Sequence, residues 1–202
     1  MIEIARAVFD RGTRKIRHAA ERRRMDQLRR NPAVPTAVLK AAKRILIVCH
    51  GNIIRSAFAA RLLAAAVGEG AAISISSGGL SAAPGSPSPP NAVSAATNLG
   101  IDLSRHASAA LDPDVVANAD LILVMEIPQL LEMRRRFPWA RSRTFLLTFL
   151  HPEGPLEIRD PVNGDPSRFQ QCFDDIARAI HPIIDVISRP HRGQAVETAR
   201  HG

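Results

Sequence analysis

The chain has 202 residues, of which 46% are apolar, so it is long enough and apolar enough to bury the core of one domain of ordinary size. Only 4% of the residues are aromatic and two are cysteines, which argues against base-stacking nucleic-acid binders, disulfide scaffolds and cysteine-based zinc sites. The formal net charge of +8 at pH 7 by itself suggests an acidic partner.

The positive charge is concentrated in the first 44 residues, which hold 13 Lys or Arg and 4 Asp or Glu, a net charge of +9. The other residues hold 14 basic and 15 acidic side chains and are nearly neutral. This asymmetry predicts a basic, partly helical extension at 1–43, a globular domain at 44–188 and a flexible tail at 189–202.

Within the extension, residues 2–21 have the pattern of an amphipathic helix, and Asn31-Pro32 and Pro35 should interrupt any helix further on. The apolar side, which includes Ile16, is expected to dock on the domain and leave the arginines in water. The alternative is that residues 1–30 contact an acidic surface on a partner or a membrane. This charge distribution argues against nucleic-acid binding by the whole protein, because the domain itself is nearly neutral.

From residue 44 onward, short apolar runs alternate with helical stretches. Strands are expected at 45–49, 72–76, 120–125 and 143–147. Helices are expected at 56–67, 91–99, 113–119, 128–137 and 166–188. Asp112 should cap the third of these helices, and Pro182 should kink the last or end it early. The alternation predicts a single α/β domain with a four-stranded parallel sheet and helices on both faces.

No apolar run is long enough to span a membrane; the longest, residues 62–67, falls far short of the length required. No apolar signal-peptide core follows the N-terminus either. We therefore expect no transmembrane segment and a cytoplasmic location.

The most informative motif begins where the first predicted strand ends. Cys49 is followed by His50, Gly51, Asn52, Ile53, Ile54, Arg55 and Ser56. A loop between a strand and a helix points its backbone N–H groups inward, and the helix adds its partial positive charge, so the loop can hold an anion. Arg55 can grip two phosphate oxygens, and such surroundings favour the nucleophilic thiolate form of a cysteine. The motif predicts a phosphate-binding loop at 50–56, with Cys49 as its nucleophile and Ser56 as a hydrogen-bond donor to the thiolate.

Over residues 44–188 the sequence resembles the low-molecular-weight protein tyrosine phosphatase family. The stretch from Val48 to Ser56 stands in place of the family's V-C-x-G-N-I-C-R-S loop. Three further motifs follow in the family's order: Ser76-Ser77-Gly78-Gly79, Gly100-Ile101-Asp102-Leu103-Ser104-Arg105-His106 and Arg159-Asp160-Pro161. The resemblance implies a phosphomonoester hydrolase that forms a phosphocysteine intermediate, needs no metal or other cofactor, and acts on a phosphorylated protein or a small phosphomonoester.

The resemblance also implies roles for individual residues. Cys49 would attack phosphorus, Arg55 would bind the phosphate and stabilise the transition state, and Asp160 would protonate the leaving oxygen and then activate water. A supporting hydrogen-bond network would consist of Asn52, Ser56, Ser77 and His106. Cys172 matches no family motif and is interpreted as a packing residue.

The sequence departs from the family pattern at the loop and at the substrate entrance. Ile54 replaces the family's second loop cysteine, so protection of the nucleophile by a neighbouring thiol is not expected. Val162 and Ala83 stand where the family has aromatic residues, which predicts weak activity on small aryl phosphates. Ile53 replaces the threonine of the family's phosphoarginine phosphatases, which argues against phosphoarginine as the substrate.

Two alternatives remain open at this point. An arsenate reductase would use the same fold and anion-binding loop, but it needs another mobile thiol, and Cys172 in the final helix is the only candidate. A regulatory or scaffold protein would instead act through its basic extension.

Overall fold

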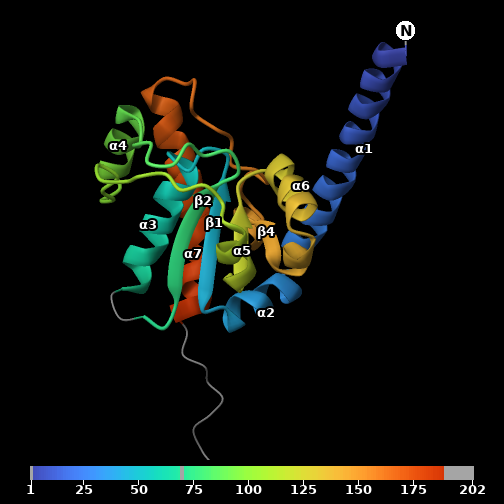
Figure 1. Ribbon diagram of the computed structural model, residues 1–202. Coiled ribbons are helices and arrows are strands. Elements are labelled where there is room, and N and C mark those ends of the chain that lie inside the picture. Colours follow the sequence, from blue (N-terminus) through green and yellow to red (C-terminus); the bar gives the residue numbers. More distant parts are fainter. Residues whose placement is uncertain (1, 69–70, 189–202) are drawn as a thin grey trace, which may run out of the picture.

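The computed structural model describes residues 2–68 and 71–188 (Figure 1). Its centre is a sheet of four strands: β1 (Arg44–Cys49), β2 (Ser74–Gly79), β3 (Leu121–Val124) and β4 (Thr144–Leu146). The strands run in the order β2-β1-β3-β4, and every neighbouring pair is parallel. The predicted four-stranded parallel sheet is therefore confirmed, although β2 begins and ends later than its expected range.

Seven α-helices surround the sheet in the described residues: α1 (Ile2–Arg30), α2 (Ala33–Ala41), α3 (Arg55–Val67), α4 (Pro90–Thr97), α5 (Pro113–Asn118), α6 (Ile127–Arg136) and α7 (Pro166–Ser188). Two 3₁₀ helices that the sequence pattern did not indicate, η1 (Pro138–Arg143) and η2 (Leu147–Leu150), flank β4.

The expected helix signals had mixed outcomes. The Asp112 carboxylate caps α5 as predicted, accepting a hydrogen bond from the Asp114 N–H at 2.7 Å. Pro182 does not end α7 early, because the helix continues to Ser188. Pro35 does not interrupt a helix either; it lies in the first turn of α2, where a missing N–H leaves no helical hydrogen bond unmade.

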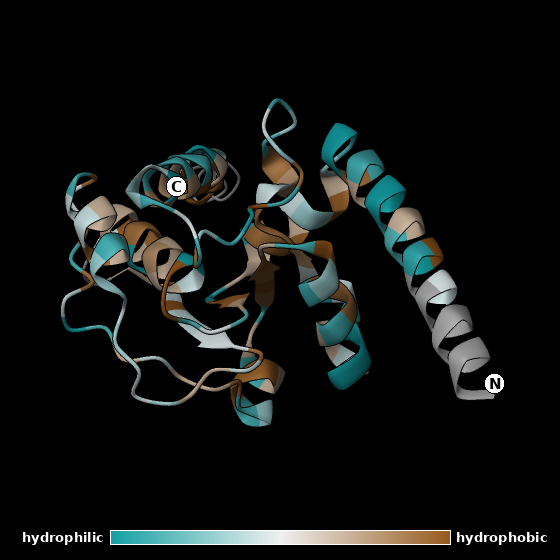
Figure 2. Cartoon of the chain, turned by 90° about the horizontal axis from the view of Figure 1, so that it is seen from above, coloured by the Kyte–Doolittle hydropathy of each residue, from teal (hydrophilic) through white to brown (hydrophobic). Residues whose placement is uncertain are grey.

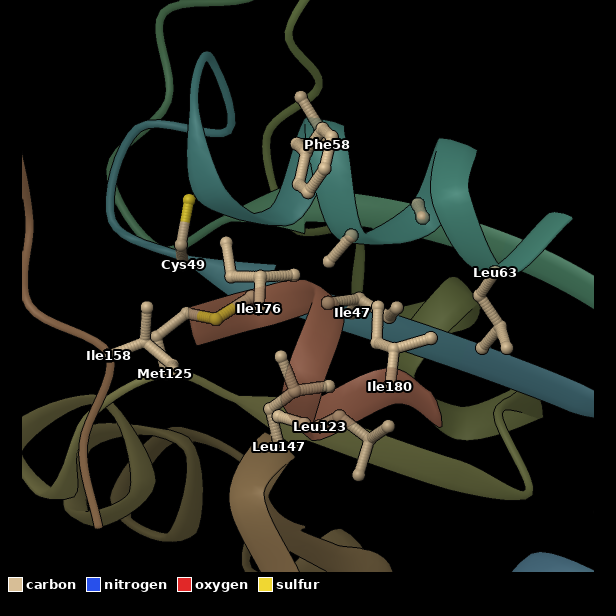
Figure 3. Close-up of a cluster of buried hydrophobic side chains, with 14 of the residues drawn as sticks. Ile47, Cys49, Phe58, Leu63, Leu123, Met125, Leu147, Ile158, Ile176 and Ile180 are labelled. Atoms are coloured by element: carbon tan, nitrogen blue, oxygen red, sulfur yellow. The ribbon is translucent and has the colours of Figure 1, made fainter. Parts of the chain in front are cut away.

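The core is divided by the sheet into two layers. Ile45 and Ile47 belong to a buried cluster with α3, α4 and α7, whereas Leu46 and Val48 belong to one with α5 and α6. This alternation is what a strand requires when both faces of its sheet are covered. Figure 3 shows Ile47, Phe58 and Ile176 of the first cluster. In that cluster, Phe58 stacks on Phe173 with ring centroids 4.0 Å apart. Helices thus cover both faces, as predicted.

Helix α1 contacts α6 and η2, while its first half extends away from the rest of the molecule (Figure 1). Where the side chains of the predicted apolar face are described, at Ile16, Ala19 and Ala20, they are exposed, so the predicted docking face is wrong for this part of the helix; Ile16 is 70% exposed. The contacting residues recur at helical spacing on another face and are mostly polar, which explains why apolar periodicity missed them: His18, Glu21, Arg22, Met25, Leu28 and Arg29. In Figure 2 the coloured part of α1 is mostly hydrophilic, whereas the centre of the molecule is apolar.

The predicted tail at 189–202 lies outside the described residues. Among the helices of the described segments, none combines the length and the apolar character that crossing a bilayer requires.

Candidate active site

The predicted phosphate-binding loop lies at the carboxyl edge of the sheet, between β1 and α3. Because β1 has β2 on one side and β3 on the other, the chain changes direction across the sheet at this point, which is where α/β proteins bind ligands. The chain after β2 holds the loop from one side: the N–H groups of Leu80 and Ser81 donate to the carbonyls of Cys49 and His50 at 3.0 and 2.9 Å. A Cβ at Gly79 would lie 2.8 Å from the His50 oxygen, so this close approach requires glycine.

Asn52 organises the loop from within. Its φ of 54° is left-handed, a conformation that asparagine tolerates better than most residues. Its side-chain Nδ2 donates to the hydroxyls of Ser56 and Ser77, both at 2.9 Å, and its Oδ1 accepts from the Ala109 N–H at 2.8 Å. The Nε2–H of His106 donates to the Asn52 carbonyl at 2.6 Å. The structure therefore brings together the four residues expected to form the supporting network.

Two donors point at the buried Cys49 thiol. The Asn52 N–H lies 3.2 Å from Cys49 Sγ, and the Ser56 hydroxyl oxygen lies 3.0 Å from it. Since that oxygen already accepts from Asn52, the hydroxyl hydrogen of Ser56 is free to point at sulfur. Both groups are placed to donate hydrogen bonds to this sulfur. Ser56, which was expected to bind phosphate, is buried behind Cys49 and does not line the cavity described below.

Arg55 is only 1% exposed, and three acceptors hold its guanidinium in place. Its Nη1 donates to Glu126 Oε2 at 2.6 Å and to the Ile158 carbonyl at 3.0 Å, while its Nη2 forms an ion pair with Asp160. Burial alone lowers the pKa of Arg55, but Asp160, Cys49 and Glu126 raise it above its usual value. The guanidinium is therefore a permanent positive charge at the loop.

Glu126 is the site residue that the sequence analysis missed. It lies two residues after β3, the strand paired with β1, so its position at the carboxyl edge of the sheet was a usable signal. Glu126 comes directly after the strand expected at 120–125, but the order of the strands in the sheet was needed to place it beside Arg55.

These groups surround a cavity of about 120 Å³, lined by Cys49, His50, Gly51, Asn52, Ile53, Ile54, Arg55, Asp160 and Val162. At about 30 Å³ for each water molecule, this space suits a small oxyanion. Val162 stands at the cavity, as expected for the position that the family fills with an aromatic residue, whereas Ala83 is not among the lining residues. Over residues 2–68 and 71–188, no cluster of three or more His, Cys, Asp or Glu side chains is arranged to hold a metal ion.

Comparison with known proteins agrees with this geometry. The family model of low molecular weight phosphotyrosine protein phosphatases matches residues 44–192. The probable low molecular weight protein-tyrosine-phosphatase EpsP of Ralstonia nicotianae is 35% identical over 138 residues, covering 68% of this chain and 91% of the relative.

Solved structures give the same result. The Erwinia amylovora tyrosine phosphatase AmsI superimposes with a TM-score of 0.68 at 32% identity, covering 73% of this chain and 95% of that one. The YwlE arginine phosphatase from Geobacillus stearothermophilus has a TM-score of 0.61 at 30% identity, covering 72% of this chain and 90% of that one. The chain therefore belongs to the low-molecular-weight phosphotyrosine protein phosphatase family.

Proposed function

We propose that this phosphatase hydrolyses phosphotyrosine in proteins through a phosphocysteine formed on Cys49. The observation that carries the proposal is that the Cys49 thiol, the Arg55 guanidinium and the Asp160 carboxyl group line one small cavity. A nucleophile, an anion-binding group and a proton donor are the three functions that hydrolysis of a phosphate ester requires.

The residues divide the reaction into two steps. In the first, the Cys49 thiolate attacks phosphorus, the ester oxygen leaves with the proton of Asp160, and Arg55 binds the equatorial phosphate oxygens. In the second, water attacks the phosphocysteine and gives its proton to the Asp160 carboxylate. The thiolate of Cys49 leaves, accepting hydrogen bonds from the Ser56 hydroxyl and the Asn52 N–H, and inorganic phosphate is released.

Two related activities fit the site less well. An arsenate reductase needs a second thiol, but burial raises the pKa of Cys172 to about 12, so this thiol stays protonated and is a poor nucleophile. Hydrolysis of phosphoarginine would place a polar guanidinium at the cavity, where Ile53 presents an apolar side chain. Both considerations favour a substrate in which the phosphate group is esterified to an oxygen atom.

The proposal is tested with para-nitrophenyl phosphate and with peptides that carry phosphotyrosine or phosphoarginine. We expect Cys49→Ser to abolish turnover while vanadate still binds, because the loop and Arg55 remain. Cys172→Ala is the matched control, because Cys172 is the other cysteine and does not line the cavity. This variant should retain turnover. Hydrolysis by the Cys49→Ser variant at the wild-type rate would refute the assignment of the nucleophile.

The role of Asp160 is tested by varying the leaving group. A general acid matters most when the leaving oxygen is basic, so Asp160→Asn should slow hydrolysis of phenyl phosphate more than hydrolysis of para-nitrophenyl phosphate. An equal loss on both esters would show that Asp160 does not protonate the leaving oxygen.

A further inference from the structure

We propose that the basic helix α1 is part of the active-site framework, with Glu157 as a positioning residue that receives its support from Arg22. This inference rests on the proposed function, because it concerns how the phosphate-binding group Arg55 is oriented. The extension lies outside the region that the family model matches, so the arrangement belongs to this chain and not to the shared domain.

Two acceptors orient the Nη1 end of the Arg55 guanidinium. Its Nη1 donates to Glu126 Oε2 and to the Ile158 carbonyl, which belong to segments far apart in the sequence. Glu126 lies between β3 and α6, whereas Ile158 lies in the chain between η2 and α7 that also carries Asp160. The guanidinium keeps one orientation only if these two segments keep their relative position.

Glu157 joins the two segments. Its Oε1 accepts a hydrogen bond from the N–H of Ile127 at 2.8 Å, so the carboxylate links the residue after Glu126 to the residue before Ile158. The Ile158 N–H adds a second link by donating to the Met125 carbonyl at 2.9 Å. Each of the two acceptors of Arg55 Nη1 is therefore one residue away from an end of the bridge formed by Glu157.

Helix α1 supplies the cationic partner of this bridge. Arg22 Nη1 lies 2.9 Å from Glu157 Oε2, and His18 Nε2 lies 3.9 Å from Oε1. The Glu157 side chain is only 18% exposed, and a carboxylate so far removed from water needs a paired charge. Arg22 satisfies that need from outside the phosphatase domain.

Two further contacts fix α1 to the same two segments. The buried Arg29 donates through Nη2 to the carbonyls of His151 and Gly154, the latter at 2.8 Å, in the chain that leads to Glu157. Glu21 forms an ion pair with Arg134 of α6, the helix that begins beside Glu126. The helix thus bridges α6 and the loop before Asp160, and it holds both of the elements that orient Arg55.

The expected effect is on binding of the oxyanion and of the transition state. Without Arg22, the bridge loses its charge partner, and the segments that hold Glu126 and Ile158 can shift separately. A displacement of a positioned group by a fraction of its hydrogen-bond length lowers catalysis steeply, so we expect about a tenfold loss in kcat/KM and in vanadate affinity for Arg22→Ala. Glu157→Leu, which removes the acceptor itself, should lose at least as much.

The experiment uses the full chain and compares Arg22→Ala, Arg22→Lys, Glu157→Leu and Arg23→Ala. Arg23 is the matched control, because it is an exposed arginine of the same helix with no ion pair among the described residues. Vanadate affinity is measured by calorimetry, kcat/KM with para-nitrophenyl phosphate, and folding by thermal unfolding. Only variants that are folded at the assay temperature are compared.

The inference is supported if Arg22→Ala and Glu157→Leu lose vanadate affinity, Arg22→Lys recovers most of it and Arg23→Ala matches wild type. It is overturned if Arg22→Ala and Glu157→Leu bind vanadate as wild type does, or if Arg23→Ala loses as much affinity as Arg22→Ala. These outcomes are separate from failure of the proposed function, which would appear as wild-type protein that does not hydrolyse phosphate esters.

Discussion

Replacing Asn52 by alanine should damage both the stability and the activity of the protein. The change removes three side-chain hydrogen bonds of the buried Asn52, to Ser56, Ser77 and the Ala109 N–H. At about 1 kcal/mol each, their loss costs about 3 kcal/mol. Alanine must also adopt the φ of 54° found here, which costs about 1 kcal/mol more. The expected total is about 4 kcal/mol, or a fall of roughly 10 °C in Tm for a domain of this size.

Urea unfolding followed by circular dichroism gives the free energy of unfolding, and para-nitrophenyl phosphate gives kcat/KM. Asn52→Gly separates the two contributions, because glycine accepts the left-handed conformation but restores none of the hydrogen bonds. It should therefore be about 1 kcal/mol more stable than Asn52→Ala. A loss below about 1 kcal/mol in Asn52→Ala, with kcat/KM unchanged, would refute the view that this side chain holds the loop in shape.

Three other predictions concern the loop, the entrance and pH. Val162 lines the cavity and is 51% exposed, so Val162→Tyr places an aromatic ring at the entrance. Stacking of this ring on the ring of an aryl phosphate, worth about 1 kcal/mol, should raise kcat/KM about fivefold. An unchanged kcat/KM would contradict this. Gly79→Ala should lower the free energy of unfolding by about 1–3 kcal/mol and reduce turnover, since the new Cβ would clash with the His50 oxygen. Wild-type stability and wild-type turnover in this variant would contradict the close approach of the two segments. Burial, and after it the charge of Arg29, lower the pKa of His151. As the pH falls below about 6.5, the unfolded chain therefore binds a proton at His151 more readily than the folded chain does, and the free energy of unfolding decreases. Urea titrations at pH 7.5 and 5.5 should show a smaller decrease for His151→Gln than for wild type, and an equal decrease would exclude His151 as a source of this pH dependence.

The sequence predicted the sheet and the loop well because their signals are local. After Arg44, strand β1 is a continuous apolar run, and the loop residues that follow it are contiguous in the sequence, so their chemistry could be interpreted before any contact was known. Ser77 comes directly after the expected strand at 72–76, but it lies within β2, opposite Ile47. Its hydroxyl still reaches Asn52, since the two strands are adjacent and parallel.

The residues that escaped prediction are those whose roles depend on tertiary structure. Glu126 and Glu157 are ordinary acidic residues in the sequence, and only the pairing of β3 with β1 and the path of the chain before α7 bring them to the site. The docking face of α1 escaped for a different reason. Apolar periodicity identifies helix faces that bury hydrocarbon, whereas α1 is held largely by ion pairs and by hydrogen bonds from Arg29.

The ion pair between Arg55 and Asp160 makes this carboxylate an internal competitor of the oxyanion. Nη2 of Arg55 points at Asp160, so a phosphate group that takes this donor displaces a negative charge already seated there. Binding of the substrate and release of the Asp160 carboxyl group are therefore thermodynamically linked, and each favours the other. Removing the competing charge, as in Asp160→Asn, should tighten vanadate binding even though it slows the reaction. The site thus loses part of its affinity for phosphate, and in return the Asp160 carboxyl group is released from Arg55 when the ester binds.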